Sequence, residues 1–305
     1  MVVFKIMLKK LFLVFLVSVL VGPVSSSHAK ESKKHIIYET PTLKSLSQLY
    51  WALSKFNPVK DSDIDNFLFI NECNLYKDYS ENEFEWNDIR KSARTFLEGS
   101  KKEFPTHFEF VQPLRFAEYD LEKKAFDVWA PYKIEGIRRF EVLAEDIFQE
   151  VCDKPYSHHV AGYPKGLYVE LNRPFTINTI PVDPAVAEAY IREQIEEGRA
   201  QGVRIRNKDD LYKSRDAYLV MKMRVFSYKE DLQNKEYKLS KVLAVLEGYE
   251  IYGDRDRQLL MFSENFRRKK ERSKMEIEMK KRYQERLKKQ MKKKRRDFET
   301  TEEAK

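Results

Sequence analysis

The run DAYLVMKMRVFSY, residues 216–228, opens the part of this chain in which the fold is easiest to recognise, residues 216–263. Alternate positions of the run are apolar, and the positions between them mix aromatic, aliphatic and basic side chains. The apolar set is Ala217, Leu219, Met221, Met223 and Val225, and the mixed set is Tyr218, Val220, Lys222, Arg224, Phe226 and Tyr228. A period of two predicts a β-strand with one buried face. If helices leave the mixed face open, we expect any binding surface to lie there.

Two further runs of β-formers complete this stretch. Residues 239–252 are rich in Val, Leu, Ile and Tyr, and they stop at the turn sequence GDRD (253–256) before residues 259–262 resume the pattern. A Gly-Asp pair flanked by β-formers is a hairpin signal. The sequence therefore predicts an antiparallel meander of three strands, which needs helices to cover it.

The residues before the meander predict helices first and hairpins afterwards. Apolar spacings of three and four predict helices over residues 43–56, 61–76 and 80–99, the third starting with a capping box of Ser80 and Glu83. Residues 108–129 predict a hairpin with Pro113 at an edge or a bulge. Further strands are expected over 138–145 and 167–171, with a short helix as an alternative over 147–151, and a helix over 185–199.

The expected fold class is α+β, with N-terminal helices packed on a mainly antiparallel sheet and a long basic helix at the C-terminus. We expect a signal peptide over residues 1–29 and a helical segment over 30–103. A mainly antiparallel α+β segment follows over 104–263, forming one body with the helices, and a basic tail ends the chain over 264–305. A split into two subdomains near Phe104 stays an alternative.

The first thirty residues have the order of a secretory signal peptide. Three lysines precede an apolar run over residues 11–21, and Gly-Pro at 22–23 ends it. Ser27 and Ala29 are small residues at the positions that precede a cut between Ala29 and Lys30. An uncleaved anchor is the alternative, but eleven apolar residues fall short of the roughly twenty that span a bilayer. We expect an exported protein, periplasmic or secreted, with no transmembrane helix after cleavage.

The chain has two cysteines, Cys73 and Cys152. In an oxidising compartment they can form a disulfide that closes a loop of about eighty residues. Two buried free thiols are the alternative, and the sequence leaves both open.

The basic charge of the chain is concentrated near its end. Residues 267–296 hold 17 basic and four acidic side chains, whereas the body from residue 30 to 266 is acidic by about five charges. This segment has no Pro or Gly and consists of good helix formers, so we expect a helix. Its apolar residues recur every four positions, which turns the row around the helix axis and disfavours a coiled coil. The row is Met275, Met279, Tyr283, Leu287 and Met291.

A dense positive charge attracts polyanions, so the tail is a candidate site for anionic lipid or phosphorylated envelope polymers, with nucleic acid the weakest choice for an exported protein. A solvated spacer is the alternative, and a protein partner for the body stays open. The candidate polyanion-binding residues are Arg267, Arg268, Lys269, Lys270, Lys280, Lys281, Arg282, Lys292, Lys293, Lys294, Arg295 and Arg296.

One carboxylate pattern suggests calcium. Asp61, Asp63, Asp65 and Glu72 occupy positions 1, 3, 5 and 12 of a calcium loop, although Asn66 replaces the glycine of the sharp turn. The alternative is an acidic N-terminus favoured by the helix dipole, with Glu72 further along an ordinary helix. No other cofactor is expected. His158 and His159 are adjacent loop histidines without a third ligand in sequence, and the common motifs of hydrolases and of phosphate-binding loops do not occur.

Three short segments resemble an uncharacterised family of exported bacterial proteins that carry a domain of unknown function. They are LYW (49–51), INECNLY (70–76) and EFEW (83–86). The resemblance covers most of a body from about residue 43 to 263. It implies a bacterial protein that is exported, and it implies no activity. We therefore expect a non-enzymatic binding or accessory protein of the cell envelope. An envelope hydrolase whose site assembles only in three dimensions and a calcium-binding protein are the alternatives.

Overall fold

The meander forms the centre of the structure. The computed structural model describes residues 36–155, 160, 163–200, 202, 204, 206–233 and 237–267. In it β8 (Asp216–Gln233) pairs antiparallel with β9 (Lys238–Tyr252), and β10 (Leu260–Asn265) pairs antiparallel with the second half of β9. The three predicted strands are therefore confirmed.

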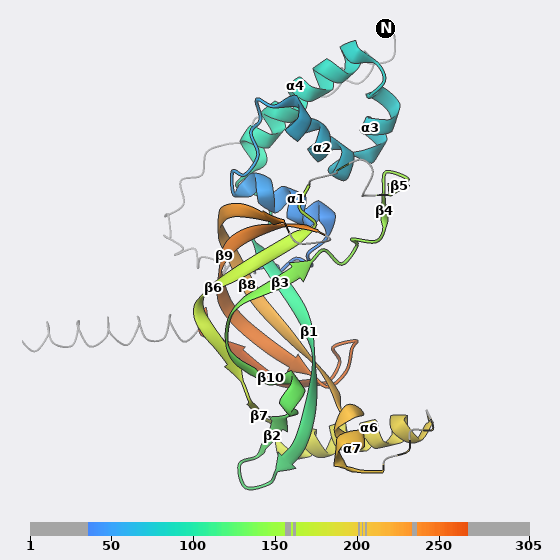
Figure 1. Cartoon of the computed structure of the whole chain (residues 1–305), viewed down its shortest axis with the longest axis vertical. Coiled ribbons are helices and arrows are strands. Elements are labelled where there is room, and N and C mark those ends of the chain that lie inside the picture. Colours follow the sequence, from blue (N-terminus) through green and yellow to red (C-terminus); the bar gives the residue numbers. More distant parts are fainter. Residues whose placement is uncertain are drawn as a thin grey trace, which may run out of the picture. The chain divides into compact units, whose positions relative to one another are not determined.

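The other strands extend this centre into one curled sheet (Figure 1). The added strands are β1 (His107–Asp120), β2 (Ala125–Val128), β3 (Ile134–Leu143), β6 (Gly166–Ile177) and β7 (Thr179–Pro181). The order is β3-β6-β9-β8-β1-β2-β7, with β10 beside β9. Only Asn178 separates β6 from β7, and its carbonyl accepts from the Val128 amide. β6 lies near one end of this order and β7 lies at the other end. Since the two strands follow each other directly in the chain, the two ends of the sheet must lie close together, and the sheet curls back upon itself.

One pair of strands corrects the expectation from sequence. β6 and β9 run parallel over Gly166 to Leu171, whereas the other strand pairs of the described residues are antiparallel. Parallel neighbours need a long connection, and here β7, two helices and β8 supply it. The sheet is thus mixed, and the fold class is α+β.

The concave side of the sheet holds the main core. Its aromatic residues include Phe108 and Phe116 from β1, Phe126 from β2 and Phe175 from β6, all buried. The helix α1 (Leu43–Ala52) closes one end, where the Tyr50 hydroxyl donates to the Gly166 carbonyl at 3.0 Å. The helix α6 (Pro184–Ala200) closes the other end, where the Tyr190 hydroxyl donates to the Asp216 carbonyl at 2.9 Å. Next to α6 lies α7 (Lys208–Lys213), a short helix that was not predicted.

The other helices build a second, smaller core. They are α2 (Asp61–Asn71), α3 (Cys73–Tyr79) and α4 (Glu83–Ser100), and Trp51, Phe67, Trp86 and Leu97 are buried among them. The predicted helix over 61–76 is in fact two helices, because Glu72 between them has a non-helical backbone with φ −131° and ψ 58°.

The predicted capping box at Ser80 is wrong. Ser80 is helical and ends α3, whereas Asn82 has an extended backbone and its side chain accepts from the Phe84 and Glu85 amides. Asn and Ser are equally good N-caps, so residue type alone does not choose between them. The extended backbone at Asn82 decides that α4 begins there.

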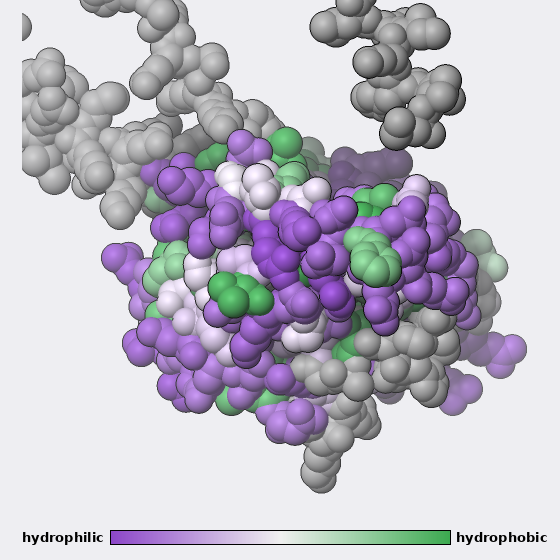
Figure 2. All heavy atoms as spheres, turned by 90° about the horizontal axis from the view of Figure 1, so that it is seen from above, coloured by the Kyte–Doolittle hydropathy of each residue, from purple (hydrophilic) through white to green (hydrophobic). Residues whose placement is uncertain are grey.

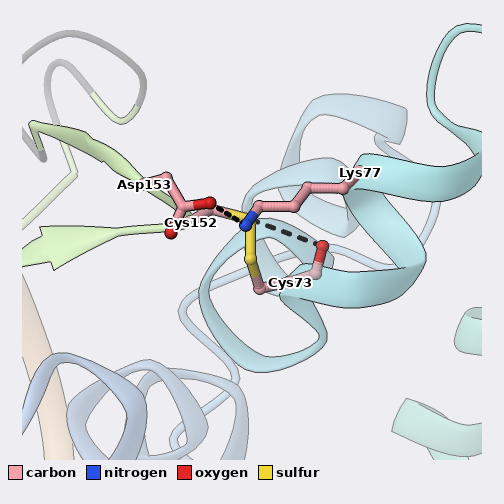
Figure 3. Close-up of a disulfide and its surroundings, with 4 residues drawn as sticks. All are labelled: Cys73, Lys77, Cys152 and Asp153. Atoms are coloured by element: carbon pink, nitrogen blue, oxygen red, sulfur yellow. Dashed lines mark hydrogen bonds and ion pairs between the residues drawn. A yellow bond between two sulfur atoms is a disulfide. The ribbon is translucent and has the colours of Figure 1, made fainter.

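A disulfide joins the helices to a hairpin that forms a separate two-stranded sheet (Figure 3). Cys73 is the first residue of α3, and Cys152 lies in the two-residue turn between β4 (Glu150–Val151) and β5 (Lys154–Pro155). Cys152 and Asp153 both have positive φ, 56° and 57°, as the tightest hairpin turns require. Lys77 forms an ion pair with Asp153 beside the bridge. The alternative helix over 147–151 is replaced in part by β4. The remaining element is a single 3-10 turn, Ala130–Tyr132.

Two of the sequence predictions concern residues that the structure does not describe. The signal peptide of residues 1–29 lies outside the described residues, and so does the basic helix from Arg268 onward. Within the part of the chain that is described, none of the helices combines the length and hydrophobicity that a membrane span requires.

Removing the disulfide tests how far it holds the helices to the sheet. The bridge spans 79 residues of sequence, so its loss from the double variant Cys73→Ser, Cys152→Ser should destabilise the protein by about 4 kcal/mol and lower its melting temperature by roughly 10 °C. Calorimetry of the oxidised protein, the reduced protein and the variant measures this. Equal melting temperatures in all three would show that the bridge carries no stability.

Candidate functional site

The mixed face of β8 is the outer, convex face of the sheet. The alternating apolar set is buried to 7% exposure or less, as predicted. On the other face Lys222 and Arg224 keep 26% and 42% of their side chains exposed. Val220 is the exception on this face, because it is completely buried. The outer face thus presents basic side chains that solvent can reach.

Glu247 is the centre of a charged cluster on this face. Its carboxylate accepts from the Tyr38 hydroxyl at 2.9 Å, and it lies 3.4 Å from Arg224 Nε and 3.4 Å from Arg267 Nη1. His107 Nε2 lies 3.7 Å away. We call these five residues the outer-face cluster. Glu247 is only 7% exposed, whereas both arginines are exposed by about 40%.

A β-bulge positions Glu247. Lys222 lies opposite Gly248 and Met223 lies opposite Leu246, so Glu247 is the extra residue in β9. Sequence reasoning missed it, because residues 242–246 are all apolar and hide the change of alternation that the structure shows. The buried positions of β9 change from even numbers, ending with Ala244, to odd numbers from Tyr249 onward, and Glu-Gly stands at the change.

The cluster also shifts the titration of its neighbours. Burial, followed by the hydrogen bond and the charge of Glu247, raises the pKa of Tyr38 to about 12. Burial lowers the pKa of His107, and the charge of Glu247 opposes this only in part. Both groups are therefore neutral near pH 7, which leaves two arginines around one carboxylate.

Two more ion pairs border the cluster on the same face. Lys222 lies 2.5 Å from Glu250, which also accepts from the Tyr252 hydroxyl at 2.8 Å. Arg257 lies 2.5 Å from Glu109. Each of these pairs is balanced, so among these three groups the excess positive charge lies at Arg224 and Arg267.

A second group of polar residues converges inside the protein. Lys55 pairs with Asp231, and its Nζ lies 3.2 Å from the Ser240 hydroxyl, which in turn donates to Asp231 at 3.0 Å. The rings of Tyr50, Phe56 and Tyr228 surround the Lys55 ammonium at 4.6 to 5.4 Å, a cation–π arrangement. The Lys55 side chain is only 4% exposed.

The end of α1 directs Lys55 to this position. Ser54 has φ 57°, the Ser54 amide donates to the Trp51 carbonyl, and the Lys55 amide donates to the Tyr50 carbonyl. This is a Schellman motif, which turns the chain sharply at a helix end. Lys55 therefore points at the ends of β8 and β9, more than 170 residues later in sequence.

Burial keeps this group from acting as a catalytic site in the conformation described. A serine near a lysine is a possible nucleophile with its base, but Ser240 is completely buried. Burial lowers the pKa of Lys55, although Asp231 opposes the shift. Burial alone would raise the pKa of Asp231, but Lys55, Lys238 and Ser240 outweigh it and hold the pKa below its ordinary value. The group thus joins α1 to the sheet.

The four calcium candidates are not brought together. Asp61, Asp63 and Asp65 lie in the first half of α2, and Glu72 lies beyond its other end. Asp61 pairs with Arg94, and Asp65 pairs with Arg90, so two of the aspartates already have cationic partners. No group of three or more potential metal ligands is found among the described residues. Asp61 and Asp65 therefore act as partners of α4, and calcium binding stays an untested hypothesis.

The candidates in the tail lie outside the described residues, with the exception of Arg267. The same holds for Ala29, Lys30, His158 and His159. Of the polyanion candidates, the structure therefore positions only the first, and it positions that one on the outer-face cluster.

Residues 60–193 match the family model described as a domain of unknown function, DUF4852. The match contains INECNLY and EFEW, but it is shorter than the expected range of 43–263. It runs from the start of α2 into α6 and omits β8 and β9, the strands between β6 and β1. No curated protein and no solved structure matches the chain.

The pair of Lys55 and Asp231 gives a testable effect of pH on stability. Because the pKa of Asp231 is lowered in the folded state, the contribution of Asp231 to the free energy of unfolding is complete above about pH 4, the ordinary pKa of an aspartate. This contribution is lost as the pH falls through the folded-state pKa. Asp231→Asn leaves the Lys55 charge buried and should cost about 3–5 kcal/mol at pH 7. Thermal melts should then show a smaller further loss for the variant than for the wild type between pH 5 and pH 3.

A matched double variant separates the charge from the packing. Lys55→Met with Asp231→Leu replaces the pair by apolar groups and should recover most of the stability at pH 7. If Asp231→Asn alone melts like the wild type, Lys55 is not held by this pair.

Proposed function

We propose that this chain is a non-enzymatic accessory protein, exported to the cell envelope, that binds anionic polymers or lipid headgroups through its basic tail and its outer face together. The body provides a rigid surface, and the tail supplies most of the charge. The bound group is an extended polyanion, since a row of 17 basic residues over thirty positions matches repeated negative charges more closely than a single ion.

The observation that carries the proposal is the position of Arg267. It is the first residue of the basic segment, and its guanidinium lies on Glu247, beside Arg224. The charge of the tail thus starts on the outer-face cluster, where two arginines share one carboxylate. The contacts with Glu247 use Nε of Arg224 and Nη1 of Arg267, and each exposed guanidinium carries further N–H groups that can donate to phosphate or sulfate oxygens.

The hydrolase alternative has less support. Lys55, Asp231 and Ser240 do assemble only in three dimensions, as that alternative requires, but aromatic rings surround the Lys55 ammonium and Ser240 is completely buried. A pocket of about 280 Å³ between α6 and α7 is lined by acids and bases of both signs, and the hydroxyl of its lining residue Ser214 donates to the Leu211 carbonyl instead of to a base. A binding surface therefore explains the described residues better than an active site.

Heparin chromatography and anionic vesicles test the proposal. The full chain should be retained in a manner that depends on salt, and a chain cut after Phe266 should lose most of the retention, because each Lys or Arg near an anionic surface is worth about 1 kcal/mol. A full-length variant with glutamine at Lys292, Lys293, Lys294, Arg295 and Arg296 should elute at clearly lower salt.

A second comparison tests the outer face alone. Arg224→Ala should lower the salt concentration of elution. The matched control is Arg139→Ala on β3, at an exposed arginine that pairs with Glu170 of β6, and it should leave the elution unchanged. Retention that survives the cut at Phe266 would contradict the role of the tail, and equal elution of the two arginine variants would contradict the role of the face.

A further inference from the structure

The helices α2, α3 and α4 border an apolar groove that no described element fills. The pocket has a volume of about 460 Å³, and its lining residues are Phe67, Leu68, Glu72, Leu75, Asp88, Ile89, Ser92, Ala93 and Phe96. Phe67, Leu68 and Ala93 are buried and form its floor, whereas Leu75 is 39% and Phe96 is 52% exposed. We call this the helical groove.

The groove is a local feature of this end of the protein. Figure 2 looks onto the end that carries α2–α4 and shows hydrophobic residues as separate spots in a largely hydrophilic surface. An apolar groove bordered by polar groups suits a helix with a narrow apolar row, which is a common way in which a groove binds a peptide.

The border of the groove is acidic. Glu72 and Asp88 are its charged lining residues, and the helical segment around it, residues 61–103, holds eleven acidic and six basic residues. This segment therefore accounts for a large part of the negative charge of the body. A partner with a basic surface around an apolar row is favoured.

The tail of the same chain has this chemistry. Its apolar row comprises Met275, Met279, Tyr283, Leu287 and Met291. A lysine directly follows Met279 and another directly follows Leu287, and Arg286 follows Tyr283 three positions later. Methionine and leucine adapt well to irregular apolar grooves. If these residues are helical, Met279 to Leu287 would extend about 12 Å, the same length as the part of α4 that lines the groove, Asp88 to Phe96.

We infer that residues 275–291 bind in the helical groove of their own chain, with Met279, Tyr283 and Leu287 against Leu75, Ile89 and Phe96 and with lysines beside Glu72 and Asp88. This goes beyond polyanion binding, because it concerns the apolar row and a different surface of the body. It gives the tail two alternative partners, one inside the chain and one outside.

Carbodiimide crosslinking of the full-length, disulfide-bonded protein at low concentration tests this inference. The reagent joins lysine to carboxylate only when the two are in contact. Mass spectrometry should find Lys280, Lys281, Lys288 or Lys289 joined to Glu72 or Asp88. The yield should fall about tenfold in Phe96→Ser and in the tail variant Met279→Asp, Leu287→Asp, since each removes apolar area from the contact.

Phe84→Ser is the matched control. It removes a phenylalanine from the same helix, but Phe84 is 86% exposed and does not line the groove, so its crosslinks should persist. A mixture of isotopically light and heavy chains distinguishes a second copy as the occupant, because crosslinks between light and heavy peptides would then appear. That result, or crosslinks that persist in Phe96→Ser, would overturn the inference. Loss of heparin retention with intact crosslinks would instead count only against the proposed function.

Discussion

The pairing of β8 with β9 is the interaction on which the rest of the structure depends. β8 also pairs with β1, and β9 also pairs with β6 and β10, so these two strands join both halves of the sheet. Their inner face supplies a large share of the main core. The end of β8 carries Asp231 and the start of β9 carries Ser240, and these two residues bind Lys55 after α1. At the start of β8 the Asp216 carbonyl accepts the hydrogen bond from Tyr190 of α6. The bulge in the same pair turns Glu247 outward to anchor Arg267.

Much of this architecture could be predicted from the sequence because it depends on local periodicity. Alternation over residues 216–228 gave the buried face of β8 correctly, and the spacing of apolar residues gave α1, α4 and α6. Local chemistry was less reliable where two residues compete for one role. Ser80 and Asn82 are both good caps, and only the backbone shows that Asn82 starts α4.

The remaining features depend on contacts that sequence spacing does not encode. Lys55 meets Asp231 across 176 positions, and Tyr38 meets Glu247 across 209. The parallel pair of β6 and β9 follows from the path of the connection between them, and short-range patterns carry no information about that path. The bulge at Glu247 is intermediate, because residues 242–246 are all apolar and only the Glu-Gly pair at 247–248 marks the bulge in the sequence.

Charge is distributed in this protein so that each part complements another. The tail is strongly basic, the helical segment is acidic, and the outer face is nearly balanced except at two arginines. Under the two proposals, the groove and an external polyanion would compete for the tail, and that competition would depend on salt.

The central claim is that the outer face and the tail bind a polyanion as one surface. The most direct measurement is nuclear magnetic resonance of the Nε–H groups of Arg224 and Arg267 in the full chain during titration with heparin. The account predicts that both resonances shift together and saturate with the signals of the tail lysines. Shifts confined to the tail, with Arg224 and Arg267 unchanged, would contradict it.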